Sequence, residues 1–543
     1  MNKLKLHLFV IILAVLTAFT FSACEFFDWL LSDSEDEPID DNPISGPNDP
    51  IIDDSYAQRV TRVEFTGPTA TVTLNDLDGH DIYLVRVNTS NSVAYASGTG
   101  TVQNIVPNLS VSMSVAYHDS DIQINELPKS GRPSDEYILF PPLSSAKEAI
   151  VNTVANFVPH NVGNTKNFWV ETFYGSGIFT QRSATLTATG THSNIWVIDN
   201  TINTTHAQNM AAKFDIIYPA ATNILGYEYG GRPGHPQPGG RDGDLKIQIL
   251  VFDILDSSGE VTAGGYYSGV DYFLNSQISR SNEAEMFYVN ASTVRDSPNY
   301  TYSLLAHEFQ HMVNFNVKYV EANATSYPQS WYNEMLSMMT EDVIAEFINI
   351  PLTDNSHPIR QGTPRFLTSY YEVGITEWGT GNPSAVLSSY DKAFAFGAFL
   401  LRNYGGADLL RRILANNTMN LDSIRSALNE ITPGLTFEEV LIRYGEAMVF
   451  SGKIPSDVKT FHKTVSNTIN GRTYRAHGFD IWNMQRRGST GRGPEVFNLN
   501  QRDMRPHSVT LHSDNTWKNK KGSYSITLQK PSNPDVVLVL MVK

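Results

Sequence analysis

The feature that most constrains this chain of 543 residues is the run His307-Glu308-Phe309-Gln310-His311, a His-Glu-x-x-His motif. Residues four apart lie on one face of an α-helix, so the two imidazoles can bind a single metal ion together. Glu308 lies about 100° further round the helix, beside such an ion and not on it. A carboxylate placed there can accept a proton from a metal-bound water. The motif therefore predicts a zinc site with hydrolytic chemistry.

The residues around the motif argue against a chance match, which amino-acid frequencies allow roughly a few times in a hundred chains of this length. Ser297-Pro298 is a good helix start, with Ser as the N-cap and Pro at the first helical position. No Gly or further Pro follows before Tyr319, and apolar residues such as Leu305 and Met312 flank the motif. We therefore expect the motif to lie on a buried helix.

A zinc site of this kind needs a third protein ligand. A Gly and a third His would occupy the positions of Asn314 and Val317 in a metzincin, so the sequence excludes that class. The other common solution is a Glu on a second helix, and Glu334 lies in the first turns of a helix predicted from Ser330 to about Ile348. The alternative is an ordinary Glu near a helix N-terminus, where the helix dipole favours it.

Two runs carry a family resemblance: Leu-Ala-His-Glu-Phe-Gln-His-Met at residues 305–312 and Trp-Tyr-Asn-Glu-Met-Leu-Ser-Met at residues 331–338. With them the chain resembles the gluzincin zinc metallopeptidases, and among these the hyicolysin-like (M30-type) peptidases and related bacterial lipoproteins. The resemblance is specific over residues 264–342. It implies an α+β fold with a zincin-type catalytic domain, in which a mixed sheet and an active-site helix precede a helical subdomain. It also implies His307, His311 and Glu334 as zinc ligands and Glu308 as the base.

The sequence departs from the thermolysin-like pattern Asn-Glu-x-x-x-Asp, whose Asp orients a ligand histidine. Four residues after Glu334 this chain has Met338. Ser337, Glu341 and Asp342 are each candidates for that task, and the sequence does not decide between them.

Two further site predictions depend on weaker patterns. Tyr390 is a candidate for stabilising the oxyanion, as a Tyr or His opposite the zinc does in gluzincins, with a buried structural Tyr as the alternative. His477 is a second candidate for the same task. A group of carboxylates, which are hard oxygen ligands, predicts a Ca²⁺ site. Its members would be Asp242, Asp244, Asp253 and Asp256. The alternative is that Asp242-Gly243 is an ordinary turn.

The N-terminus reads as an export signal. Lys3 and Lys5 precede an apolar run at residues 6–21, which predicts a signal peptide over residues 1–23. Cys24, the only cysteine, follows Phe-Ser-Ala in a sequence that resembles a bacterial lipobox. We therefore expect an exported, membrane-anchored bacterial lipoprotein, at the cell surface or facing the periplasm, lipidated at Cys24. An ordinary secretory signal is the alternative.

The remaining organisation follows from composition and periodicity. Residues 24–55 are acidic and without Lys or Arg, which predicts a disordered tether and accounts for much of the formal net charge of −16. No basic patch suggests nucleic acid as a partner. Alternating strands, with a hairpin turn expected at Asp78-Gly79, predict small β-rich modules on either side of the catalytic region. The boundaries are 56–135 for a β-sandwich accessory module, 145–465 for the catalytic region (β-rich over 160–295, helical over 296–455) and 466–543 for a C-terminal β module.

Together these features predict a zinc-dependent endopeptidase that hydrolyses protein substrates outside the cytoplasm through water activated by Glu308. The alternative is a surface adhesin or structural lipoprotein whose zinc site is vestigial or structural. An intact Glu308 favours the enzyme, because a structural site has no use for that carboxylate.

Overall fold

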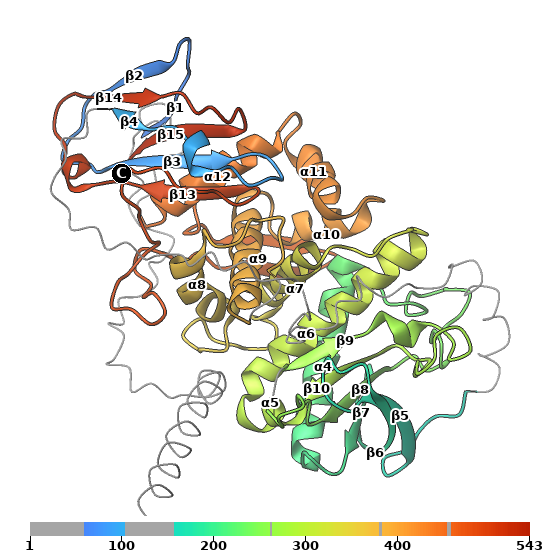
Figure 1. Cartoon of the computed structure of the whole chain (residues 1–543). Helices are drawn as coiled ribbons and strands as arrows, with labels where there is room; N and C mark the ends of the chain where they lie inside the picture. Colours follow the sequence, from blue (N-terminus) through green and yellow to red (C-terminus); the bar gives the residue numbers. More distant parts are fainter. Residues whose placement is uncertain (1–58, 104–156, 261–262, 380–382, 453–457) are drawn as a thin grey trace, which may run out of the picture.

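A computed structural model describes residues 59–103, 157–260, 263–379, 383–452 and 458–543 (Figure 1). Helices and sheets are mixed, with a sheet-rich part followed by a helix-rich part, so the predicted α+β class is confirmed at this level. The predicted signal peptide, Cys24 and the acidic tether lie outside the described residues. Within those described residues, no helix is long and apolar enough to cross a membrane.

A six-stranded sheet forms the first half of the catalytic region. Strands β7 (Ser193–Ile198), β8 (Ile247–Phe252) and β10 (Met286–Asn290) run parallel at its centre. Each of their residues is buried, as expected for strands covered on both faces. The strand β9 pairs antiparallel with β10 and ends the sheet on that side. In spatial order the strands are β5 (Thr165–Glu171), β6 (Phe179–Thr189), β7 (Ser193–Ile198), β8 (Ile247–Phe252), β10 (Met286–Asn290) and β9 (Gly265–Tyr267).

Two long helices, α4 (Thr204–Leu225) and α6 (Pro298–Asn314), pack against each other and against this sheet. The rings of Phe214 in α4 and Phe309 in α6 meet edge to face with their centroids 5.3 Å apart. A short helix, α5 (Ala291–Asp296), joins β10 to α6. The predicted helix start at Ser297-Pro298 is confirmed, although the Ser297 side chain makes no capping hydrogen bond. The helix continues to Glu321 with π-helical geometry after Asn314, in the stretch without Gly or Pro.

The helix α7 (Ser330–Ile344) returns antiparallel along α6, because Asn333 at its start meets Asn314 at the end of α6. Its other face packs on α9, where a Cβ at Gly397 would lie 2.7 Å from Met339 Cγ. Glycine fits there because a side chain at this position would require Met339 to shift. The remaining helices are α8 (Pro358–Ser369), α9 (Pro383–Asn403), α10 (Ala407–Ala415), α11 (Asn420–Ile431) and α12 (Phe437–Phe450).

The two ends of the described chain form one β structure, seen as blue and red strands together in Figure 1. In the first sheet β15 lies between β1 and β3, and in the second β14 lies between β2 and β4. The β modules that the sequence analysis separated, 56–135 and 466–543, therefore share both sheets. Their strands are β1 (Val60–Arg62), β2 (Thr69–Leu74), β3 (Ile82–Asn88), β4 (Val102–Gln103), β13 (Ser508–His512), β14 (Tyr524–Gln529) and β15 (Val536–Val542).

This pairing corrects two expectations. Asp78-Gly79 connects β2 and β3, which lie in different sheets, so the predicted hairpin is not formed. The backbone groups of these strands find their partners in the C-terminal strands instead. The hairpin of β11 (Val465–Ile469) and β12 (Arg472–Ala476), assigned mostly to the C-terminal module, packs on the catalytic region. There the Tyr474 hydroxyl donates a hydrogen bond to the Ala220 carbonyl in α4, at 2.8 Å.

Candidate metal centre

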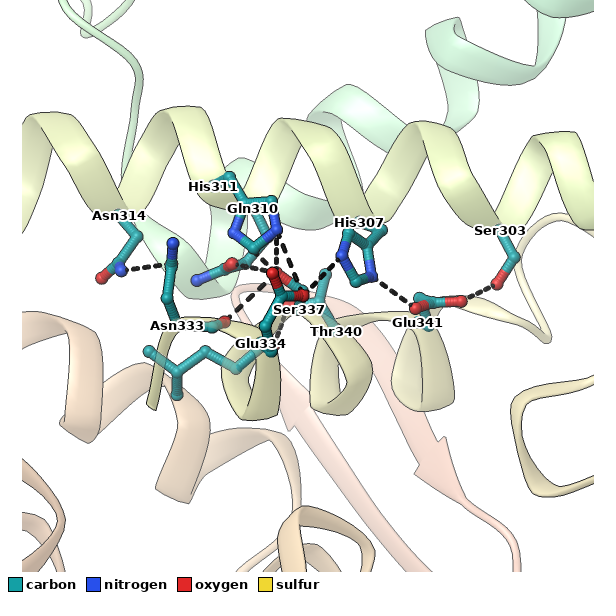
Figure 2. Close-up of polar contacts among 11 residues, drawn as sticks. Ser303, His307, Gln310, His311, Asn314, Asn333, Glu334, Ser337, Thr340 and Glu341 are labelled. Carbon is teal, nitrogen blue, oxygen red and sulfur yellow. Dashed lines mark hydrogen bonds and ion pairs between the residues drawn. The ribbon is translucent and has the colours of Figure 1, made fainter. Parts of the chain in front are cut away.

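The facing sides of α6 and α7 bring His307, His311 and Glu334 together (Figure 2). Their ligand atoms all lie within 4.8 Å of one another, and all three side chains are buried. The Nε2 atoms of His307 and His311 lie 3.0 and 3.5 Å from the same oxygen, Oε2 of Glu334. The three residues predicted as zinc ligands thus converge on one point from two helices.

This donor set fits zinc by both chemistry and spacing. Two imidazole nitrogens and one carboxylate are ligands that catalytic zinc sites use, with a fourth position left for water or substrate. Bonds of about 2.0–2.1 Å in a tetrahedron separate neighbouring ligand atoms by about 3.3 Å. The observed separations of 3.0 and 3.5 Å bracket that value. The three residues could therefore hold the ion with little rearrangement.

The outer nitrogen of His307 meets a second carboxylate. Nδ1 lies 2.7 Å from Oε1 of Glu341, and Oε2 of Glu341 accepts a hydrogen bond of 2.5 Å from the Ser303 hydroxyl. Figure 2 shows this chain running from Ser303 through Glu341 to the imidazole. Of the three candidates that the sequence left open for orienting a ligand histidine, Glu341 is thus the one in contact with His307.

The surroundings of His307 change its proton affinity. Burial lowers the pKa of His307, but hydrogen bonds and charge from Glu334 and Glu341 outweigh burial and raise it to about 10. A metal ion would have to displace that proton, because imidazole binds metals in its neutral form.

On the Nδ1 side, His311 meets a neutral hydroxyl instead of a second carboxylate. Its Nδ1 lies 3.1 Å from the hydroxyl of Ser337, which in turn donates a hydrogen bond of 2.5 Å to Oε1 of Gln310. Ser337, the second candidate from the sequence, therefore contacts His311. One turn further along α6, the Asn314 amide donates a hydrogen bond of 2.7 Å to Asn333 and joins the two helices.

Asp342, the third candidate, lies outside the site. Its carboxylate receives two hydrogen bonds from the guanidinium of Arg402, at 2.6 and 3.2 Å, and both side chains are fully buried. Glu341 and Asp342 are neighbours in sequence but lie about 100° apart round α7. The first therefore faces α6, and the second contacts α9.

Glu308, the predicted base, is buried at 1% exposure beside the edge strand of the sheet. A Cβ built on Gly265 in β9 would lie 3.6 Å from Cγ of Glu308 and only 2.6 Å from the Tyr288 carbonyl oxygen. Glycine at this position avoids a clash with the backbone of β10, while Glu308 lies within van der Waals distance. The edge strand and the predicted base therefore adjoin.

The other residues predicted for the site are Tyr390 and His477. Tyr390 is half-buried and packs edge to face on Trp378, with ring centroids 4.9 Å apart. Its catalytic role stays a prediction. His477 pairs with Glu346, Nε2 to Oε2, at 3.4 Å.

The structure gives the calcium prediction no support. Asp244 accepts hydrogen bonds from Asn194 and Gln248, and Asp253 pairs with Arg295. Among the residues that the structure describes, only His307, His311 and Glu334 form a group of three with ligand spacing.

The sequence analysis missed Ser303 and Gln310, which support the two histidines. Helical spacing offered a signal for Ser303 and Glu341, the two residues that support His307. Ser303 precedes His307 by one turn, and Glu341 follows Glu334 by two turns, so each lies on the same face as its neighbour. Only the packing of the two helices makes these faces meet.

Comparison with known proteins identifies the family. The profile of the Peptidase M30 family matches residues 178–467, a stretch that includes all three clustered side chains. This chain belongs to the peptidase M30 family. It is also 25% identical, over 415 residues, to "Neutral metalloprotease ShpI" of Staphylococcus hyicus, an alignment covering 72% of this chain and 84% of that protein. The resemblance to M30-type peptidases is confirmed, and this M30 peptidase is a metal-dependent hydrolase of protein or peptide substrates.

Proposed function

We propose that this M30 peptidase is a zinc endopeptidase that cleaves proteins outside the cytoplasm, with Glu308 as its general base. The observation that carries the proposal is the convergence of His307, His311 and Glu334 on one point. Glu308 follows His307 directly in the sequence and lies beside the edge strand β9. A metal site, a buried carboxylate and a strand edge together are what peptide hydrolysis needs.

A zinc ion held by His307, His311 and Glu334 supplies Lewis acidity, which polarises a peptide carbonyl and acidifies water. The Glu308 carboxylate accepts a proton from the attacking water. It then returns this proton to the nitrogen of the leaving amine. Burial suits Glu308 to this task, because a proton held there is exchanged with bulk water less readily than one held at the surface.

The edge strand β9 is the proposed binding site for the substrate backbone. It pairs with β10 on one side only, because it ends the six-stranded sheet. An extended peptide can add to such an edge through main-chain hydrogen bonds, which are largely independent of its sequence. Such pairing favours an endopeptidase that acts on unfolded or extended segments. Tyr390 remains our proposed oxyanion-stabilising residue.

The proposed location is outside the cytoplasm, on a lipid anchor. Its support is in the sequence: an export signal at residues 1–23, Cys24 in a lipobox-like setting, and an acidic tether over residues 24–55. A tether that repels itself would hold the catalytic region away from the membrane surface.

The test of the mechanism is Glu308→Gln, which keeps the shape of the side chain and removes its proton acceptor. Zinc content and melting temperature should change little. Hydrolysis of an unfolded protein such as casein should fall at least about 10²-fold, the lower range for losing general acid–base catalysis. Glu321→Gln, at the exposed end of the same helical stretch, is the matched control.

The adhesin alternative predicts a different result. A protein with a structural zinc would cleave nothing, and Glu308→Gln would change no measurable property. If wild type cleaves casein and Glu308→Gln cleaves it equally fast, the mechanism proposed here is refuted.

A further inference from the structure

We propose that Glu341 is the positioning residue of the metal centre, and that Ser303 holds its carboxylate against the imidazole of His307. The inference rests on the proposed function, because it concerns the zinc site named there. It gives Glu341 and Ser303 the task of orienting His307, which the His-Glu-x-x-His motif does not specify. Its consequence is that metal affinity depends on a carboxylate that does not contact the metal.

Both oxygens of Glu341 are engaged in one chain of contacts. Oε1 lies 2.7 Å from Nδ1 of His307, and Oε2 accepts the hydrogen bond of 2.5 Å from Ser303. The side chains of His307 and Glu341 are only 9% and 12% exposed, and Ser303 is buried. In such surroundings the oxygens of a carboxylate depend on protein groups for their hydrogen bonds, since little water reaches them.

This contact determines which nitrogen of His307 is offered to the metal. A carboxylate accepts hydrogen bonds and cannot donate them, so it favours the proton on Nδ1. In the neutral imidazole, the form that binds a metal, Nε2 then has the lone pair, and it is Nε2 that faces Glu334, at 3.0 Å. A carboxylate behind an imidazole also raises the basicity of that ligand. Glu341 thus selects the tautomer, the ring orientation and the donor strength of His307.

The helical spacing shows how the sequence builds this device without the usual Asp. Position 338, four residues after Glu334, is Met338, which packs against the apolar core. Glu341 lies one further turn along the same face, opposite the N-terminal half of α6. Ser303 precedes His307 by one turn and lies where it can reach the same carboxylate. The aspartate of the thermolysin-like pattern is thereby replaced by a residue with a longer side chain.

The two histidines are supported differently, and this gives the inference a selective consequence. His311 contacts the neutral hydroxyl of Ser337, whereas His307 contacts a carboxylate. Charge-assisted hydrogen bonds are roughly twice as strong as neutral ones. We therefore expect the loss of Glu341 to weaken metal binding more than Ser337→Ala does.

A purely structural role for Glu341, as a cross-link between α6 and α7, is the competing explanation. Glu341→Gln separates the two roles. The amide keeps the size of the side chain and can still accept one hydrogen bond, but it removes the charge. A cross-link alone would change the melting temperature of the metal-free protein and leave its zinc affinity unaltered.

The experiment measures zinc dissociation constants of the full chain in detergent, by competition with a chromophoric chelator at one pH. Glu341→Ala should weaken zinc binding by about 10–100-fold, the range for partners of ligand histidines. Glu341→Gln and Ser303→Ala should each weaken it by less. Because Ser303 acts through Glu341, adding Ser303→Ala to Glu341→Ala should change nothing further.

Glu346→Gln is the matched control, since Glu346 is half-exposed beyond the end of α7 and pairs with Arg475 at 2.6 Å. The visible spectrum of the Co²⁺ form is the second readout. It should change in Glu341→Gln and stay the same in Glu346→Gln, because only the first alters a ligand imidazole. Circular dichroism checks the fold of each variant. If Glu341→Ala does not fold, Glu341→Gln and Ser303→Ala decide the outcome.

Unchanged zinc affinity and an unchanged Co²⁺ spectrum in Glu341→Gln and Ser303→Ala would overturn the inference and leave the proposed function standing. A wild-type protein that binds no zinc would overturn both. Weakened binding in the Glu341 variants with full activity in saturating zinc would support a positioning role, since the residue then acts only through occupancy of the site.

Discussion

The buried ion pair between Asp342 and Arg402 allows a quantitative test of how α7 is held in place. The two side chains are 1% and 0% exposed, and two hydrogen bonds of 2.6 and 3.2 Å join them. Replacing Asp342 with Leu leaves the guanidinium charged, because Arg does not lose its proton in proteins. It still contacts the carbonyl oxygens of His477 and Ala398 and the ring of Phe479, none of which carries a negative charge to neutralise it.

Removing one partner of a buried pair costs about 3–5 kcal/mol, since the other charge is left uncompensated. Unfolding entropy is about 2 cal/mol/K per residue, or about 0.6 kcal/mol/K for a cooperative unit of roughly 300 residues. Asp342→Leu should therefore lower the melting temperature by about 5–8 °C in differential scanning calorimetry. The double variant Asp342→Leu/Arg402→Met should melt above the single variant, because no unpaired charge remains.

The exposed pair of Arg412 and Glu430, 2.8 Å apart, is the control. Glu430→Gln should change stability by less than about 1 kcal/mol, as surface pairs do. Zinc affinity of folded Asp342→Leu should match wild type, because Asp342 contacts neither histidine. The reasoning fails if Asp342→Leu has the melting temperature of the wild type. It also fails if the double variant has a lower melting temperature than Asp342→Leu. A large loss of zinc affinity in folded Asp342→Leu would show that Asp342 also helps to orient the metal ligands.

Two further predictions concern acid stability and the anchor. Burial lowers the pKa of His357 to about 4, while Nδ1 accepts the Ile359 amide at the start of α8. The unfolded chain, with a pKa near 6.5, binds more protons between these values, so stability should be complete above about pH 6.5 and fall by roughly 3 kcal/mol towards pH 4. His357→Asn keeps a cap that does not titrate, and an unaltered pH profile of its melting temperature would contradict this origin. Palmitate labelling should require Cys24, and a labelled, membrane-bound Cys24→Ser protein would show that the lipobox interpretation is wrong.

The sequence by itself determined the features that depend on short-range geometry. The spacing of His307 and His311 puts them on one helical face whatever surrounds the helix, because helical periodicity is a property of neighbouring residues. The same holds for the buried strands β7, β8 and β10, because a continuous apolar run of strand length is itself a local pattern. Glu334 could be placed on a second helix for the same reason.

Strand partners were decided only by the tertiary structure. Alternation predicts that β3 and β15 are strands, but their pairing joins Val85 to Val539, two residues far apart in the chain. No local pattern encodes such a partner, since any strand edge of suitable length can satisfy the same backbone groups. The N-terminal and C-terminal modules therefore looked separate in the sequence.

The residues that hold the histidines were also left open by the sequence. Ser337, Glu341 and Asp342 are all polar residues on one helix, and each could have faced His307. They differ by the angle at which they leave α7, so the packing of that helix determines their tasks. With α6 on one side and α9 on the other, Glu341 reaches His307 and Asp342 reaches Arg402. The sequence thus specified which chemical groups were available, and helix packing decided which of them meet, because contacts between helices depend on their relative position and rotation.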